Sequence, residues 1–161
     1  MARLHRSLLG FTLIELLVTL AIVAVLAGAA LPMAEVTVKR SKEQQLHGAL
    51  QEIRSALDAY KQAVQEGRIA LKAGESGYPP SLEALVLGID DNKSQNGGKL
   101  YFLRRIPRDP MVQDSTQKAS ATWGMRSYAS GPDSPKAGDD VFDVYSTSTE
   151  IGLNGVPYRE W

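Results

Sequence analysis

An almost uninterrupted apolar run near the N-terminus constrains this chain more than any other feature. Residues 11–33 are 23 consecutive positions among which Glu15 is the single charged side chain. A helix needs about 20 apolar residues to cross the hydrocarbon core of a bilayer. The run is therefore long enough to span a membrane, and the remainder of the 161 residues must fold outside it. A chain of this length predicts one folded domain.

Three interpretations compete for this run. A secretory signal peptide fits the basic start and Ala27-Gly28-Ala29, which has the small residues of a cleavage site. The second interpretation is a plain transmembrane anchor, which fits the length of the run. The third is a signal that is cleaved before the apolar run, so that the run stays in the mature protein. Glu15 argues against the first two, because a buried carboxylate costs roughly 3 kcal/mol on insertion and usually has a functional partner. Basic residues flank the run on both sides, so they do not decide in which direction the segment crosses the membrane. They are Arg3 and Arg6 before the run and Lys39, Arg40 and Lys42 after it.

The residues at the start of the run carry a specific resemblance. Gly10-Phe11-Thr12-Leu13-Ile14-Glu15 is similar to the processing site of type IV prepilins and of the pseudopilins of type II secretion. The resemblance implies that a prepilin peptidase removes the leader 1–10 by cutting after Gly10, and that the new N-terminal Phe11 is methylated.

Glu15 has two interpretations. The resemblance implies that its carboxylate pairs with the free amine of Phe11 on a neighbouring subunit and so sets the register of assembly. Opposite charges attract strongly in a medium of low dielectric constant. The alternative is a tolerated polar residue close to the membrane surface.

Gly28 and Pro32 mark a weak point late in the apolar run, since a proline inside a helix removes one backbone hydrogen bond. In one interpretation Pro32 simply ends the membrane helix. In the other, which the resemblance to pilin-like proteins implies, the helix continues and loosens there when subunits pack in the filament.

Beyond the apolar run, the spacing of apolar residues predicts an amphipathic stretch of the same helix. One face carries Leu46, Leu50, Ile53, Leu57, Tyr60 and Val64, with Ala49 and Ala56 beside them. The other face is polar and carries Lys42, Glu43, Gln44, Gln51, Glu52, Arg54, Asp58, Lys61 and Gln62. Gly67 predicts the end of the helix. A helix from Phe11 to about residue 66 would be about 84 Å long, so its first half must project from the domain.

The second half of the chain predicts loops and short strands. Ser81 is placed to cap a short helix over residues 82–87, and 90–99 is a polar loop. β-forming residues gather at 122–130 and 141–146. The pattern predicts two or three short antiparallel strands packed on the C-terminal half of the long helix, which is an α+β fold.

This half adds a second resemblance. Tyr78-Pro79-Pro80 stands before the short helix, and Tyr101-Phe102-Leu103-Arg104-Arg105-Ile106-Pro107-Arg108-Asp109-Pro110 follows it. The order of these segments and the Gly/Asp-rich tail resemble the major pseudopilin of type II secretion.

Aspartates gather in a loop that glycines and prolines interrupt: Asp133, Asp139, Asp140 and Asp143. Carboxylates and backbone carbonyls are the ligands that Ca²⁺ takes, so the loop is a candidate calcium site. The resemblance supports this, because related major pseudopilins carry calcium in the corresponding loop, and it favours Asp133, Asp139 and Asp140 as ligands. A solvated acidic turn is the alternative, EF-hand spacing is absent, and Asp143 is also placed to begin a strand.

Composition excludes several other classes. The sequence has no cysteine, so a small exported domain of this kind needs another staple or packing against neighbours. It has two histidines and a formal net charge of zero, and it shows no phosphate loop, nucleophile elbow or catalytic Cys–His pair. These features predict a chain that is not an enzyme and that has no nucleic-acid partner. Three arginines beside Asp109 predict a surface cluster of ion pairs, namely Arg104, Arg105 and Arg108.

The resemblance implies a structural subunit with a leader (1–10), a membrane and filament-core helix (11–33) and a periplasmic globular domain (34–161). It would wait in the inner membrane as a single-pass protein and then join a helical pseudopilus that supports export of folded proteins. The implied partners are other copies, minor pseudopilins, the prepilin peptidase, an inner-membrane assembly platform and the lipid bilayer. The alternatives are a major or minor pilin of a type IV pilus, for adhesion, motility or DNA uptake, and a membrane-tethered periplasmic binding module that never polymerises.

Overall fold

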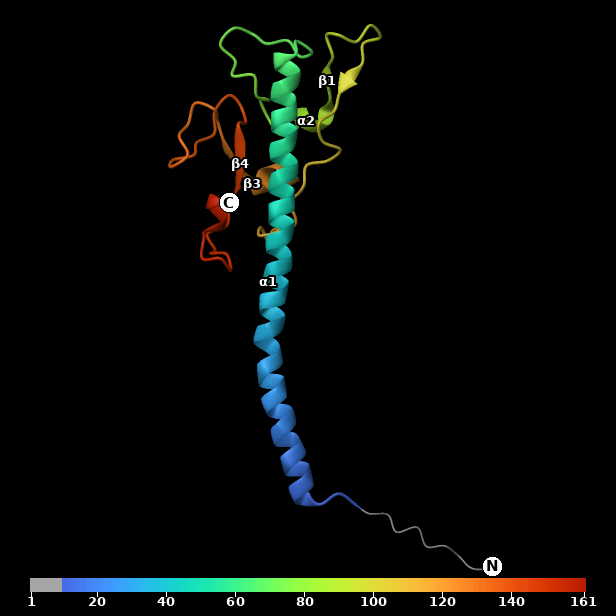
Figure 1. The fold of residues 1–161 in the computed structure, drawn as a ribbon, viewed down its shortest axis with the longest axis vertical. Coiled ribbons are helices and arrows are strands. Elements are labelled where there is room, and N and C mark those ends of the chain that lie inside the picture. The colour runs from blue at the N-terminus through green and yellow to red at the C-terminus, as the bar shows by residue number, and fades with distance from the viewer. Residues whose placement is uncertain (1–9) are drawn as a thin grey trace, which may run out of the picture. The chain divides into compact units, whose positions relative to one another are not determined.

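The computed structural model describes the backbone of residues 10–161 and the side chains of these residues except 29–32. The chain divides into two compact units, Met1–Lys39 and Arg40–Trp161. One helix, α1 (Leu13–Gln65), contributes to both units (Figure 1). Its bounds confirm the prediction of a single long helix from about residue 11 to about residue 66.

In the first unit, α1 begins immediately after the predicted cleavage site. The Thr12 hydroxyl accepts a hydrogen bond from the Glu15 backbone N–H at 3.3 Å. This is the bond of an N-cap residue, which satisfies one of the free N–H groups of the first turn. The helix continues past Pro32, so the proline does not end it. By its length and composition, the helix is long and apolar enough to cross a membrane.

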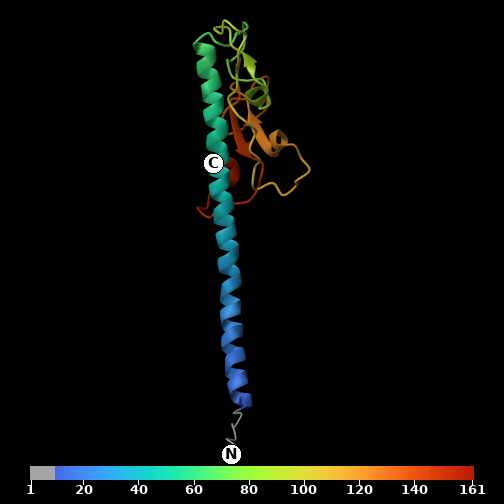
Figure 2. The ribbon, with the colours of Figure 1, turned by 90° about the vertical axis from the view of Figure 1, so that its right-hand side faces the viewer.

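In the second unit, the predicted apolar face of α1 is the centre of the hydrophobic core. None of its side chains, from Leu46 to Val64, is more than 9% exposed. They pack with residues from the loops and strands that follow: Ile69, Leu82, Leu85, Leu103, Trp123, Val141, Val144 and Tyr158. In Figure 2, the strands and α2 lie on one side of this part of α1. The long helix is therefore the element on which the rest of the unit folds.

The end of α1 follows the prediction at Gly67. This residue has a φ of 71°, in the left-handed region that favours glycine. Its N–H and the N–H of Arg68 donate to the carbonyl groups of Val64 and Ala63, both at 2.9 Å. The Arg68 guanidinium then pairs with Asp91 at 2.6 Å, and this hydrogen bond lowers the pKa of Asp91. The turn after α1 is thus tied to the loop that follows β1.

The predicted short helix is shorter than expected. Helix α2 spans Ala84–Leu87, its N-cap residue is Glu83, and no side chain caps it. The prediction that Ser81 caps a helix starting at residue 82 was therefore wrong. The Ser81 carbonyl instead accepts the N–H of Ala84 at 3.3 Å in a preceding turn. Burial of Leu82 and Leu85 at 0% exposure holds this turn in place, so tertiary packing decides its geometry rather than capping.

The strands form two separate antiparallel pairs. Strands β1 (Ile89–Asp90) and β2 (Lys99–Leu100) make one pair. Strands β3 (Trp123–Arg126) and β4 (Asp143–Ser146) make the other, with Trp123 opposite Ser146. A short 3₁₀ helix, η1 (Ala119–Thr122), precedes β3. A second one, η2 (Tyr158–Glu160), lies near the C-terminus. The α+β prediction is confirmed, and Asp143 does begin a strand, but the β1–β2 pair at the ends of the expected polar loop was missed.

The prediction that Asp109 belongs to a surface cluster of ion pairs was wrong. Its carboxylate is not part of a surface cluster with the neighbouring arginines, because the residue is 1% exposed. One carboxylate oxygen accepts the Ser146 hydroxyl at 2.6 Å and the other accepts the N–H of Met111 at 2.8 Å. The N–H of Asp109 in turn donates to the Thr122 hydroxyl at 3.1 Å. The segment around Pro110 is thereby joined to β4 and to the turn before β3.

Candidate functional site

The predicted processing site lies in non-helical chain directly before α1. Gly10 and Phe11 both precede the first helical residue, and the Phe11 side chain is 84% exposed. The leader residues 1–9 lie outside the described residues. Among the described residues, the bond after Gly10 is neither part of a helix nor buried, and cleavage there stays a prediction.

Glu15 lies in the first turn of α1, on the exposed surface of the first unit. Its backbone N–H donates to the Thr12 hydroxyl, which caps the helix. Among the described residues, no hydrogen bond or ion pair involves its carboxylate. The predicted pairing with the Phe11 amine of another subunit is not tested by a single chain and stays a prediction.

The second unit contains a set of contacts that the sequence analysis did not predict, between α1 and residues 150–161, which we call the C-terminal segment. Glu43 of α1 is 9% exposed. Its Oε1 atom accepts the backbone N–H of Leu153 at 2.7 Å and the hydroxyl of Tyr158 at 2.9 Å. Burial raises the pKa of Tyr158, and the bond to Glu43 raises it further, so the hydroxyl keeps the proton that it donates.

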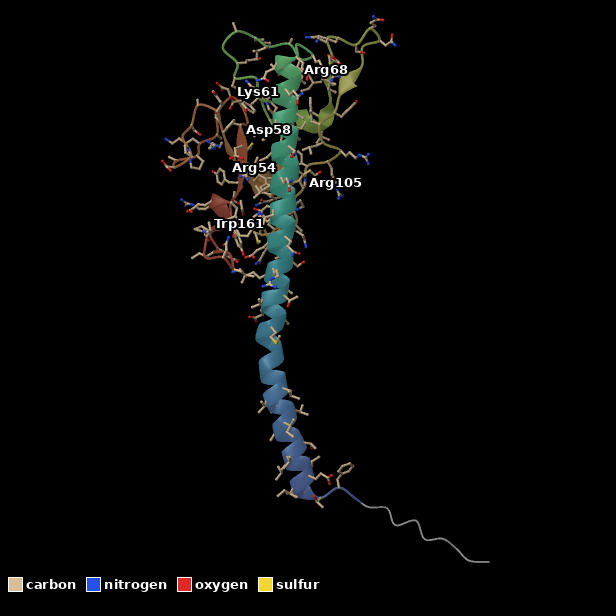
Figure 3. The ribbon with its side chains drawn as sticks, in the orientation of Figure 1. Arg54, Asp58, Lys61, Arg68, Arg105 and Trp161 are labelled. Atoms are coloured by element: carbon tan, nitrogen blue, oxygen red, sulfur yellow. The ribbon has the colours of Figure 1, made fainter. Side chains whose placement is uncertain are left out.

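Arg54, eleven residues further along α1, makes the second set of contacts. Its Nε donates to Asp143 at 2.8 Å, and its Nη2 donates to the carbonyl oxygens of Val144 at 3.2 Å and Trp161 at 2.7 Å. Figure 3 shows Arg54 on α1 and Trp161 in the adjacent C-terminal segment. One guanidinium therefore joins α1, β4 and the C-terminal segment, which suits its fixed fork of donors.

Aromatic stacking completes the attachment between these two polar contacts. The rings of His47 and Trp161 are stacked, with centroids 4.2 Å apart and an interplanar angle of 19°. The Trp161 ring also meets the Tyr158 ring edge-on at 5.0 Å. The C-terminal segment is thus attached to α1 at Glu43, His47 and Arg54. These contacts attach the C-terminal segment to α1 without a disulfide.

The sequence analysis placed Glu43 and Arg54 on the polar face of α1, and for Glu43 this was wrong. Glu43 stands three residues before Leu46 and seven before Leu50, so it lies on the same helical face as the core residues. This spacing was the feature of the sequence from which the burial of Glu43 could have been predicted. Its buried partner, the hydroxyl of Tyr158, is 115 residues away in the sequence, and no local pattern could identify it.

The predicted calcium ligands are not brought together as a set. Asp133 and Asp139 are exposed, whereas Asp140 is partly buried and accepts the N–H of Tyr128 at 2.9 Å. Burial opposes ionisation of Asp140, but hydrogen bonds from Ser76, Tyr128 and Ser127 lower its pKa overall. In the part of the chain that the structure describes, no three His, Cys, Asp or Glu side chains could hold one metal ion. Calcium binding by this loop stays a prediction.

Comparison with known proteins identifies the family. Residues 9–31 match the profile of the prokaryotic N-terminal methylation motif. The type II secretion system core protein G of Pseudomonas aeruginosa is 31% identical over 138 residues, covering 84% of this chain and 92% of that protein. The chain belongs to the core protein G family.

A second member of the core protein G family gives the same result. The type II secretion system core protein G of Klebsiella pneumoniae is 26% identical over 138 residues, covering 82% of this chain and 91% of that protein. No solved structure matches the chain. The predicted resemblance to the major pseudopilin is confirmed by these matches, which extend over the globular unit as well as the apolar helix.

The attachment at Glu43 can be tested in a fragment covering Arg40–Trp161. Replacing Glu43 by alanine leaves the Leu153 N–H and the buried Tyr158 hydroxyl without an acceptor, which should destabilise the fold by about 3 kcal/mol. Urea denaturation followed by tryptophan fluorescence measures this. Glu52→Ala, at an exposed position of the same helix, should change stability by less than about 0.5 kcal/mol. Equal stability of the Glu43 variant and wild type would contradict the role of this carboxylate.

Calcium binding can be tested in the same fragment. A ligand that binds only the folded state stabilises it by about 2.7 kcal/mol at a hundredfold excess over Kd, so the fragment should melt several degrees higher in calcium than in chelator. Asp140→Ala should reduce that difference. Asp114→Ala should not, because its carboxylate lies outside the loop and binds Thr116. The same melting temperature in calcium and in chelator would show that the loop is a solvated acidic turn.

Proposed function

We propose that this chain is a structural subunit of a type II secretion pseudopilus, processed by a prepilin peptidase and assembled with other copies into a helical filament. The observation that carries the proposal is the match to core protein G over 92% of the length of the Pseudomonas aeruginosa protein. Both matches, which cover 91% and 92% of the two relatives, are to secretion proteins, which favours this role over a type IV pilin. In this role the chain is a structural component and catalyses no reaction itself.

Gly10 supports processing at the predicted bond for a physical reason. A Cβ atom built on Gly10 would meet nothing within 4 Å, and the residue has no positive φ. Folding of the described chain therefore does not require glycine at this position. In our proposal the peptidase, whose active site must approach the backbone closely, is what requires glycine here.

The first part of α1 supports a membrane-anchored precursor. Its described apolar side chains are exposed, among them Leu13, Ile14 and Leu16 at 64% or more. Such a surface is stable where lipid or another apolar helix covers it. In our proposal the bilayer covers it before assembly and neighbouring subunits cover it afterwards, with the second unit in the periplasm.

The remaining partners follow from the same proposal. Minor pseudopilins and an inner-membrane assembly platform would contact the growing filament, and a separate ATPase would supply the energy for extension. The filament would then act as a piston or screw that moves folded proteins through the outer membrane. The contribution of this chain is a uniform building unit whose long helix can stack on that of the next copy.

Processing is tested first. The chain co-expressed with a prepilin peptidase should yield a mature protein that begins at Phe11 and carries one N-methyl group, because Gly10 precedes the cleaved bond. Intact mass measurement gives the new N-terminus directly. A product beginning at Ala30 or Leu31 would instead identify an ordinary signal peptide and would overturn the proposal.

Assembly is tested at Glu15. Glu15→Val should be cleaved normally but should assemble poorly, because the Phe11 amine of the neighbouring subunit loses its partner in a medium of low dielectric constant. The amount of sheared filament, measured by immunoblot against total mature protein, reports this. Glu35→Val, at another exposed acidic position of α1, is the matched control and should assemble as wild type does. Normal filament yield from Glu15→Val would refute the pairing.

A further inference from the structure

The dipeptide Asn-Gly occurs at two places in the chain, Asn96-Gly97 and Asn154-Gly155. In this dipeptide the backbone nitrogen of the glycine can attack the side-chain amide carbon of the asparagine, because glycine has no Cβ atom to crowd the approach. The attack closes a succinimide ring. The reaction needs a particular backbone geometry, so the fold decides whether each of the two sites can undergo it.

The two sites are alike in exposure and in the space around them. Asn96 and Asn154 are both exposed. Gly97 has a φ of 65° and Gly155 has a φ of 82°, and a Cβ atom built on either glycine would meet nothing within 4 Å. Access of water and steric crowding therefore do not distinguish one site from the other.

Hydrogen bonds hold the site at Asn154 in a fixed turn. The Oδ1 atom of Asn154 accepts the N–H of Val156 at 3.0 Å. The N–H of Gly155 donates to the carbonyl of Gly152 at 2.9 Å. For the attack, the Gly155 nitrogen must turn toward the Asn154 side chain until the reacting atoms are about 3–3.5 Å apart. Both hydrogen bonds oppose that movement, because the first holds the side chain and the second holds the attacking nitrogen.

The site at Asn96 lies at the tip of the loop between β1 and β2, and this loop is held only at its base. The N–H of Asp91 donates to the carbonyl of Gly98, and the N–H of Gly98 donates to the Ser94 hydroxyl, both at 2.9 Å. Within the described part of the chain, no hydrogen bond involves the Asn96 side chain or the Gly97 N–H. The tip can therefore change its backbone angles without breaking a bond, and such a loop opens at little cost in free energy.

We propose that Asn96 is a site of spontaneous deamidation, whereas its turn protects Asn154. The Gly97 nitrogen loses its proton to solvent and forms a bond to Cγ of Asn96. The bond from Cγ to the side-chain nitrogen breaks, and that nitrogen takes up a proton from solvent and leaves as ammonia. Water then opens the succinimide at one of its two carbonyls, which gives either aspartate or isoaspartate.

Deamidation at Asn96 changes the charge of the chain without disturbing its core. The sequence has 18 basic and 18 acidic side chains, so one conversion leaves one net negative charge. The new carboxylate lies in a loop that already carries Asp90 and Asp91. Because the tip residues are exposed, modified and unmodified copies should share one fold and differ in surface charge.

Peptide mass spectrometry measures both sites in one experiment. The full-length protein in detergent is kept folded in mildly alkaline buffer, and samples taken over time are digested with trypsin and compared with a sample taken at the start. The tryptic peptides 94–99 and 137–159 contain one asparagine each. Asn96 should convert about tenfold faster than Asn154, because two hydrogen bonds must break at the second site. Isoaspartate methyltransferase should label peptide 94–99 from the aged protein.

Two controls separate the fold from the local sequence. In concentrated urea, which removes the turn at Asn154, the two asparagines should convert at similar rates. In the folded chain, Gly97→Ala should slow conversion of Asn96 about tenfold, because a methyl group hinders the attacking nitrogen. Gln95→Ala, at the exposed position before Asn96, is the matched control and should leave the rate unchanged. The thermal unfolding midpoint of each variant shows whether it is folded.

Two results would overturn the inference. One is conversion of Asn154 in the folded chain as fast as that of Asn96. The other is a tenfold difference that persists in urea, because neighbouring residues rather than the fold would then set the rates. The inference is independent of the proposed function, so neither result bears on processing at Gly10 or on filament assembly.

Discussion

Burial of one face of α1 is the interaction on which the rest of the second unit depends. The strands are two and four residues long, and isolated pairs of this size are marginal in water. They are stable here because Leu46, Leu50, Ile53 and Leu57 provide a continuous apolar surface, each side chain being at most 2% exposed. Each fully buried side chain of this kind contributes roughly 2 kcal/mol, so the helix supplies much of the stability that the strands cannot supply to each other.

Buried polar groups decide where the loops attach to that surface. Glu43 and Arg54 position the C-terminal segment, and Asp109 positions the segment before η1 against β4. In the described part of the chain, no buried side-chain nitrogen or oxygen lacks a hydrogen-bond partner. Apolar burial is non-directional, whereas these bonds fail unless donor and acceptor meet at one geometry. Directional bonds of this kind give a domain without disulfides a single arrangement of its loops.

The sequence predicted the parts of the fold that depend on local patterns. The 4-3-4-3-4 spacing identified the large core side chains of α1, although it missed the buried Ala63. Gly67 identified the end of the helix. Both signals depend on residues close in the chain. Predictions failed where the partner is distant. Glu43, read as part of the polar face, binds Tyr158, and Asp109, read as an exposed partner of arginines, binds Ser146. At the candidate sites, the motif around Gly10 could be recognised because it is contiguous, and residues 9–31 match the N-terminal methylation motif, while cleavage after Gly10 stays a prediction. Three aspartates that are close in sequence, by contrast, need not converge in space.

The two parts of α1 differ in what covers their apolar side chains. From Leu46 onward the chain covers the apolar face of the helix with its own loops and strands. In the first unit, Val18, Leu20 and Val25 are all more than half exposed, and no other described segment packs on them. An apolar surface of this length remains unfavourable in water until something outside the chain covers it. A bilayer and a stack of identical helices can both do so, and a subunit can therefore pass from one to the other without refolding its globular unit.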